Sequence, residues 1–309
     1  MKNALCLLAS LFLLGPALAD EEEEERPVPQ SLDELRTAIT EVMEEHDVPA
    51  VGIAMVDESG SVLIDAWGKA NVEEDIDADA DSMFRIGSTS KMFVALSVLK
   101  LVEEGRLSLD DRLADLAPEI EFANPWEETN PVLLAHLLEH TTGWDDIHLP
   151  EYAHNDPTPA TLREGLDFHP HSRISRWVPG SRSSYCNSGP PVAAYIVQKI
   201  TGQDFEDYVR ENFWEPMGME TMTYRLSDDV RSKGVMLYQG GEPQEYWHIV
   251  MRPSGSINAS PVDMAKFASF FVNRGIVNGV QLISEASLQR MEQPATTSAA
   301  AVGQEAGYG

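Results

Sequence analysis

Basic residues and cysteines are scarce in this chain. Its 309 residues include 22 Lys and Arg against 51 Asp and Glu, which gives a formal net charge of −29. Because so acidic a surface repels a phosphate backbone, we expect no nucleic-acid partner. Of the two cysteines, Cys6 lies in an apolar N-terminal segment, so Cys186 has no internal disulfide partner. No second Cys or paired His stands near Cys186 at ligand spacing, and we expect neither a metal nor a cofactor.

After the first 19 residues the chain also lacks any long apolar run. Lys2, the apolar residues 4–14 and the triplet Ala17-Leu18-Ala19 are typical of a signal peptide that is cleaved after Ala19. This run is too short to span a bilayer as a helix. We therefore expect removal of residues 1–19, export to the periplasm or medium, and no stable membrane anchor afterwards. The acidic stretch 20–30 predicts a disordered, solvated tail.

The next residues predict a helix followed by a β-hairpin. Ser31-x-x-Glu34 forms a capping box ahead of apolar residues at helical spacing, and Pro49 should end that helix. Two apolar runs, 51–56 and 62–67, flank a turn-forming segment. A helix followed by a hairpin favours an antiparallel sheet covered by helices over a βαβ repeat.

Strand signals are few between about 107 and 223, where short helical patterns alternate with loops. Helices are expected over 190–200, ending at Gly202, and over 204–213, ending before Pro216. The predicted fold is α/β of the α+β type, within a domain spanning 31–309. Its sheet part would comprise 31–106 and about 224–309, and its mostly helical part about 107–223.

Past residue 224 the signals are mixed. The runs 234–238 and 247–251 could return to the sheet. Ser260-Pro261-Val262-Asp263 has the cap, proline and acidic residue of a helix start, and a last helix is expected over about 284–291.

Ser88 and Lys91 are candidates for nucleophilic catalysis. A serine hydroxyl becomes a nucleophile when a base takes its proton and the resulting oxyanion is stabilised. The two residues stand three apart at the start of an apolar helix, so they share one face. Gly87 permits a sharp turn that puts Ser88 at the helix N-terminus, where backbone N–H groups favour negative charge. Burial should lower the pKa of Lys91 and let it act as a base.

The same spacing occurs a second time, at Ser97 and Lys100. Ser97 lies in mid-helix, where its hydroxyl most simply bonds back to the preceding turn. Lys100 is nine residues from Lys91 and should therefore face the opposite side, near the helix C-terminus. Spacing alone does not show which of the two pairs is catalytic. The residues around Ser88 must decide this.

Those surroundings resemble a known family. Phe84-Arg85-Ile86-Gly87-Ser88-Thr89-Ser90-Lys91 resembles the nucleophile motif of class C β-lactamases and of the related penicillin-binding carboxypeptidases, D-amino-acid peptidases and β-lactamase-like esterases. Tyr185-Cys186-Asn187, which follows Trp177-Val178-Pro179-Gly180, resembles their Tyr-x-Asn motif. The segment 137–143 resembles the turn between these motifs, and the resemblance covers roughly Leu32 to Gly309.

The resemblance implies a β-lactamase/transpeptidase-like fold and a set of roles. Ser88 would be the nucleophile and its backbone N–H an oxyanion donor. Tyr185 would reach Ser88 and Lys91 across a cleft with a pKa lowered by nearby cations, and either Lys91 or Tyr185 would be the acylation base. Asn187 would hold Lys91 and a substrate carbonyl. His140 is expected to be structural.

One departure from the family remains. The third family motif, Lys- or His-x-Gly, is not found after Asn187, and its strand would supply the second oxyanion N–H. Loss of one such donor costs about 2.7–4 kcal/mol of transition-state stabilisation. Ala306-Gly307-Tyr308-Gly309 resembles the start of the strands that carry this motif, so we expect a chain truncated at its C-terminus and impaired in activity.

Two classes of function follow from these observations. The first is an exported serine hydrolase that forms an acyl-enzyme on Ser88 with an ester, a D-amino-acid peptide or a β-lactam. The second is a non-catalytic protein of the same fold that binds peptidoglycan-like ligands, or an inactive fragment. The expected partner is a small-molecule or peptide substrate, and the sequence leaves the oligomeric state open.

Overall fold

The structure is a computed structural model that describes residues 27–148, 152–154, 160–168 and 170–296. The expected signal peptide, most of the acidic tail and the segment Ala306–Gly309 lie outside these residues. The chain divides into two compact units after Val42, within helix α1 (Leu32–Glu45). As predicted, Ser31 caps the start of α1, since the Glu34 N–H donates to Ser31 Oγ at 3.1 Å. The Glu34 carboxylate accepts the Gln30 N–H at 2.6 Å in place of the reciprocal bond of a full capping box. Among the described helices, none has both the length and the apolar character of a membrane span.

The predicted hairpin is present in the second unit. Strands β1 (Ala50–Asp57) and β2 (Gly60–Asn71) pair antiparallel, with a register shift between Met55 and Val56. The short strand β3 (Ile76–Asp77) adds to β2, which makes a three-stranded sheet in the order β1-β2-β3. Gly60 has a φ of 125°, a conformation that only glycine adopts easily, and it closes the turn.

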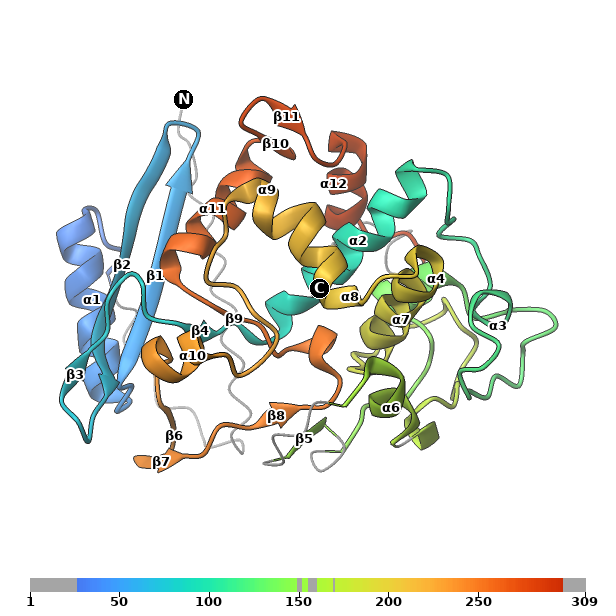
Figure 1. The fold of residues 1–309 in the computed structure, drawn as a ribbon, viewed down its shortest axis with the longest axis horizontal. Coiled ribbons are helices and arrows are strands. Elements are labelled where there is room, and N and C mark those ends of the chain that lie inside the picture. The colour runs from blue at the N-terminus through green and yellow to red at the C-terminus, as the bar shows by residue number, and fades with distance from the viewer. Residues whose placement is uncertain (1–26, 149–151, 155–159, 169, 297–309) are drawn as a thin grey trace. The chain divides into compact units, whose positions relative to one another are not determined.

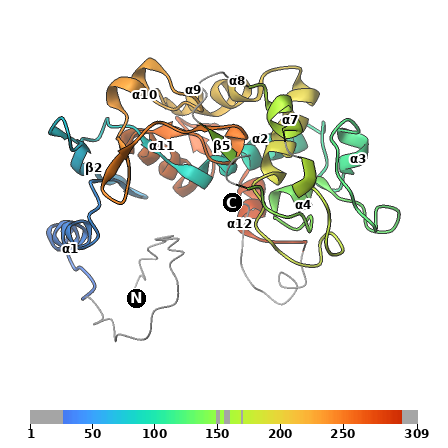
Figure 2. The ribbon, with the colours of Figure 1, turned by 90° about the horizontal axis from the view of Figure 1, so that it is seen from below.

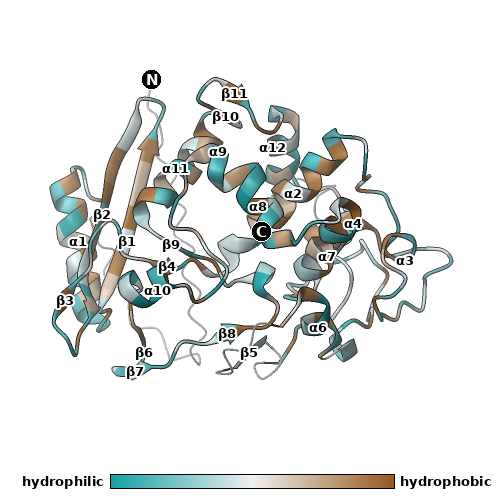
Figure 3. Ribbon diagram, in the orientation of Figure 1, coloured by the Kyte–Doolittle hydropathy of each residue, from teal (hydrophilic) through white to brown (hydrophobic). Residues whose placement is uncertain are grey.

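Helix α2 (Lys91–Glu103) lies at the centre of the hydrophobic core. Helix α11 (Pro261–Val272) packs between it and the hairpin, and α7 (Gly189–Thr201) packs on its other side. In both ribbon views the order across this unit is β2, α11, α2, α7 (Figures 1 and 2). Phe93 of α2 stacks on Phe267 of α11, with ring centroids 4.5 Å apart. Figure 3 shows that β1 is largely apolar, as expected for a strand packed against α11.

Helices make up most of the regular structure described between residues 107 and 223. They are α3 (Leu113–Leu116), α4 (Leu134–Leu138), α6 (Leu162–Asp167), α7, α8 (Phe205–Val209) and α9 (Glu215–Met217), with a 3₁₀ turn over Pro170–Ser172. Gly202 caps α7 with a φ of 73°. The predicted stop before Pro216 is wrong, because a π-helical turn (Arg210–Trp214) connects α8 to α9. Pro216 stands in the first turn of α9, where its missing N–H is tolerated, and Gly218 ends the helix.

The expected return of two later runs to the main sheet is also wrong. Strand β6 (Leu237–Gln239) pairs with β7 (Glu242–Gln244), because Gly240 and Gly241 adopt positive φ and close a tight hairpin. Strand β8 (His248–Ile249) pairs with β5 (Ala153–His154). The Met236 N–H, just before β6, does donate to the Ala70 carbonyl of β2 at 2.8 Å.

Two later helices begin close to their predicted starts. Ser260 Oγ accepts the Asp263 N–H at the start of α11, and Ser284 caps α12 (Glu285–Glu292). The other elements are β4 (Phe84–Arg85), β9 (Asn258–Ala259), α10 (Asp228–Lys233), β10 (Ile276–Val277) and β11 (Val280–Gln281). These small antiparallel sheets with helices confirm the α+β class, while the proposed boundaries of a sheet part and a helical part stay a prediction.

Candidate active site

Ser88 lies in a 3₁₀ turn (Gly87–Ser90) that continues directly into α2. Gly87 adopts a φ of 56°, in the left-handed region that favours glycine. Ser90 Oγ donates to the Gly87 carbonyl at 2.7 Å and accepts the Ile257 N–H at 3.2 Å, which ties the turn to the chain just before β9. Ser88 is therefore held at a helix N-terminus, where the first N–H groups have no acceptor within the helix.

Lys91 is buried beneath Ser88, with only 2% of its surface exposed. Its Nζ donates to Ser88 Oγ at 3.0 Å and to the Ser254 carbonyl at 2.5 Å. Burial lowers the pKa of Lys91 to about 7, although the negative charge of Asp146 acts in the opposite direction. This agrees with the direction expected from the sequence, and about half of the Lys91 side chains are neutral at neutral pH.

Tyr185 brings a second proton-carrying group to Ser88. Its hydroxyl lies 2.7 Å from Ser88 Oγ, and Lys91 Nζ lies 4.9 Å from the centre of its ring. The side chain is 46% exposed, so the site opens to solvent on this side. The expected lowering of its pKa is wrong. Partial burial raises the pKa of Tyr185, and the charges that act on it come from acidic groups such as Asp146 and not from a cation.

Asn187 is held by Asp146 at two points. The Asn187 backbone N–H donates to Asp146 Oδ1 at 2.8 Å, and Asn187 Nδ2 donates to Asp146 Oδ2 at 3.0 Å. The expected contact between Asn187 and Lys91 is therefore replaced by two others. The Asn187 amide donates to Asp146, and the Lys91 amine donates to the Ser254 carbonyl. Asn187 follows Tyr185 by two residues in the chain.

His140 supports the loop that carries Tyr185. Its ring stacks on the Tyr185 ring with centroids 4.4 Å apart, and its Nδ1 accepts the Cys186 N–H at 3.2 Å. Cys186 is buried, its Sγ contacts the Asp145 carbonyl and Ser188 Oγ, and burial raises the pKa of its thiol. These contacts agree with the structural role expected for His140.

The second Ser-x-x-Lys pair forms no such cluster. Ser97 Oγ donates to the Phe93 carbonyl at 2.7 Å, which is the predicted bond to the preceding turn. Lys100 Nζ donates to the Leu282 carbonyl at 3.3 Å. The structure therefore brings Ser88, Lys91 and Tyr185 together and leaves Ser97 and Lys100 apart.

Sequence reasoning missed two contributors to the site, Asp146 and the Ser254 carbonyl. Asp146 is 41 residues from Asn187 in the chain, and a backbone carbonyl has no residue signature. The only local signal is that Asp146 closely follows the turn at Gly143, which resembles a family segment. Within the described parts of the chain, no three His, Cys, Asp or Glu side chains gather as metal ligands.

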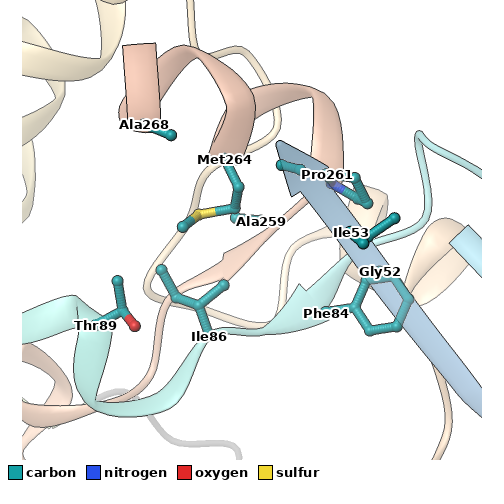
Figure 4. A pocket seen from close by; sticks show the side chains of 10 residues that line it. Gly52, Ile53, Phe84, Ile86, Thr89, Ala259, Pro261, Met264 and Ala268 are labelled. Carbon is teal, nitrogen blue, oxygen red and sulfur yellow. The ribbon is translucent and has the colours of Figure 1, made fainter. Parts of the chain in front are cut away.

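An apolar cavity of about 380 Å³ adjoins the Ser88 turn. Ile86 and Met264 point toward each other across it, and Gly52 and Ile53 of β1 line one side (Figure 4). Ser88, Lys91 and Tyr185 are not among its lining residues, so this cavity is distinct from the group that carries the chemistry.

Comparisons with known proteins agree with this geometry. The model of the family described as Beta-lactamase matches residues 35–309. Penicillin-binding protein 4 of Amycolatopsis lactamdurans is 27% identical over 278 residues, covering 85% of this chain and 68% of that protein. Protein flp of Staphylococcus aureus (strain MW2) is 23% identical over 255 residues, covering 79% of this chain and 49% of that protein.

The fold is similar to that of a solved structure, the octameric penicillin-binding protein homologue from Pyrococcus abyssi. The TM-score is 0.73 at 26% identity, and the match covers 84% of this chain and 59% of that one. The chain thus spans between about half and two thirds of the length of these relatives.

Proposed function

Since this chain belongs to the beta-lactamase family, we propose that it is a serine hydrolase that forms an acyl-enzyme on Ser88. The observation that carries the proposal is the position of Ser88 Oγ, 3.0 Å from Lys91 Nζ and 2.7 Å from the Tyr185 hydroxyl. Both distances lie within hydrogen-bond reach, which a proton transfer from the nucleophile requires.

Lys91 is the proposed base for acylation. With a pKa of about 7, its amine is substantially neutral at neutral pH, whereas the raised pKa of Tyr185 keeps that phenol protonated. The neutral amine can donate one N–H to the Ser254 carbonyl and direct its lone pair at Ser88 Oγ. Ser88 would then attack the substrate carbonyl as Lys91 takes its proton.

Tyr185 is proposed to carry the proton onward. As a protonated phenol beside Ser88, it can donate its proton to the leaving group, and the proton that Lys91 took from Ser88 then passes to the Tyr185 oxygen. The Ser88 N–H, at the helix N-terminus, would stabilise the oxyanion, and water would then hydrolyse the acyl-enzyme. Asn187 would contact a polar group of the substrate with its remaining donor and acceptor.

The proposed substrates are compounds with an activated or amide carbonyl. Short esters, D-amino-acid peptides and β-lactams all present such a carbonyl to the same groups. The names of two relatives refer to penicillin binding, which supports the formation of a covalent adduct with a β-lactam. We favour an esterase or a peptidase over a dedicated β-lactamase, and we propose that the protein is exported through its N-terminal signal segment.

Turnover of three substrates tests this proposal. We expect the protein to hydrolyse a p-nitrophenyl ester or a peptide ending in D-alanine faster than nitrocefin, and Ser88→Ala to abolish turnover. Equal rates with Ser88→Ala would contradict the role of Ser88. An adduct with fluorescent penicillin that is not turned over would instead favour the second candidate, a ligand-binding protein of the same fold.

A further inference from the structure

We propose that Asp146 is a positioning residue of this site, which fixes the orientation of Asn187 and acts on Lys91 through its negative charge. The inference rests on the acyl-enzyme function proposed above. Asp146 does not touch the reacting atoms. It acts through Asn187, to which it is hydrogen-bonded, and through its electrostatic interaction with Lys91.

The contacts of Asp146 leave Asn187 one orientation. Asp146 Oδ1 accepts the N–H groups of Asn187 and Ile147 at 2.8 and 2.9 Å, and Oδ2 accepts Asn187 Nδ2 at 3.0 Å. A carboxylate only accepts hydrogen bonds, so the amide of Asn187 must turn its nitrogen toward Asp146. The Asn187 oxygen and one N–H therefore remain available in a defined direction, and a flip of the amide would place two acceptors against each other.

The loop that carries Asp146 is itself firmly held. Gly143 adopts a φ of 78°, and a Cβ atom there would stand 2.8 Å from the Trp177 carbonyl. Thr142 Oγ1 accepts the Trp144 N–H at 3.2 Å, and the Asp145 N–H donates to the Ser172 carbonyl at 3.0 Å. Because the residues just before Asp146 are anchored in this way, its carboxylate is presented to Asn187 from a defined position.

Asp146 also acts on Lys91 through its charge. The other groups that act on Lys91 or lie against it are the Ser88 hydroxyl, the Tyr185 ring, the Cys186 thiol and the uncharged Ser254 carbonyl. Burial raises the pKa of both Tyr185 and Cys186, so neither is an anion at neutral pH. The carboxylate thus favours the ammonium form of Lys91 and moderates the effect of burial.

Two further groups complete these surroundings. Tyr152 lies near Tyr185, and its pKa is raised by burial, so its phenol is neutral as well. Arg252, in the 3₁₀ turn that provides the Ser254 carbonyl (Arg252–Ser254), is ion-paired with Glu206. Substitution of Asp146 therefore changes a charge that acts on Lys91 and leaves every reacting side chain in place.

The test compares Asp146→Asn with the adjacent Asp145→Asn as a matched control. Asp145 pairs through its side chain with Arg176, and its Oδ1 accepts the Asp146 N–H at 2.9 Å, an acceptor that the Asn side chain retains. The readout is the rate of Ser88 labelling by a fluorophosphonate as a function of pH. We expect Asp146→Asn to shift the midpoint to lower pH by about one unit and to slow labelling at the plateau about tenfold, because the charge is lost and Asn187 is free to flip. Asp145→Asn should match the wild type.

The variant Asp146→Glu separates the two effects and serves if Asp146→Asn does not fold. It keeps the charge but displaces the carboxylate, so we expect a midpoint like that of the wild type and a slower plateau. An unchanged midpoint in folded Asp146→Asn, or wild-type labelling in Asp146→Glu, would overturn the inference.

A titration of Lys91 distinguishes failure of this inference from failure of the proposed function. If the wild type is not labelled at Ser88, the proposed function fails. The ¹³Cε signal of Lys91, assigned with Lys91→Arg, still reports the charge effect. A midpoint lowered in Asp146→Asn and not in Asp145→Asn supports the electrostatic action of Asp146, and equal midpoints in all three proteins overturn it.

Discussion

The pH dependence of acylation follows directly from the surroundings of Lys91. Burial brings the pKa of this side chain down to about 7, and the amine must be neutral to accept the proton of Ser88. The direction of the pH dependence follows: acylation slows as pH falls through 7 and reaches a plateau above it. For a single titration at this pKa, the neutral fraction rises from about 9% at pH 6 to about 91% at pH 8, a tenfold increase in rate.

The assay is single-turnover labelling of Ser88 by a fluorophosphonate between pH 5.5 and 10.5 at constant ionic strength. A midpoint near 7 is expected for Lys91 as the base. If Tyr185 were the base, its raised pKa would place the rise in rate in the alkaline range, well away from the midpoint expected for Lys91. A profile that is flat through neutral pH, or one that rises only in that alkaline range, would refute the assignment of Lys91.

Three further substitutions probe the site and its frame. Tyr185→Phe should slow acylation by about 10²–10⁴-fold and keep the midpoint near 7, measured by the same labelling, and an unchanged rate would exclude Tyr185 from proton transfer. Gly189→Ala should destabilise the protein by about 1–3 kcal/mol in denaturant unfolding, because the new Cβ would stand 2.7 Å from the Leu137 carbonyl, and wild-type stability would contradict that close approach. Glu139→Gln should cost about 1–3 kcal/mol in urea unfolding, because it removes the charge of buried Glu139 that pairs with the partly exposed Arg290, and wild-type stability would speak against this pair as a structural anchor.

Local signals were enough to locate the longer of the described helices, whereas short ones such as α4 and α10 were not predicted individually. Ser31 and Ser260 are side-chain caps, and Gly202 has the left-handed conformation that ends α7. Each of these effects depends on residues within a few positions of one another. These helix ends can therefore be predicted from the sequence alone.

Strand pairing was harder to predict because it depends on distant segments. The run that contains β8 is apolar enough for a central sheet, yet it pairs with β5, nearly a hundred residues earlier. The end of the helix near Pro216 was also mispredicted. A π-helical turn precedes α9, so the proline stands in the first turn of α9, where it does not end the helix.

In the candidate site, spacing could identify only residues that share one helix. Ser88 and Lys91 belong to one continuous helical segment, so their distance follows from helix geometry. Tyr185 was identified by family resemblance. The Ser254 carbonyl and Asp146 were not identified, because the former is backbone and the latter meets Asn187 across a long stretch of chain.

Mass spectrometry of the covalent adduct tests the central claim most directly. After reaction with a fluorophosphonate or fluorescent penicillin, the account predicts one adduct per chain on the peptide that contains Ser88. It predicts no adduct in Ser88→Ala and an undiminished adduct in Ser97→Ala, which alters the matching serine of the second Ser-x-x-Lys pair. An adduct that persists in Ser88→Ala, or one that maps to another residue, would contradict the account.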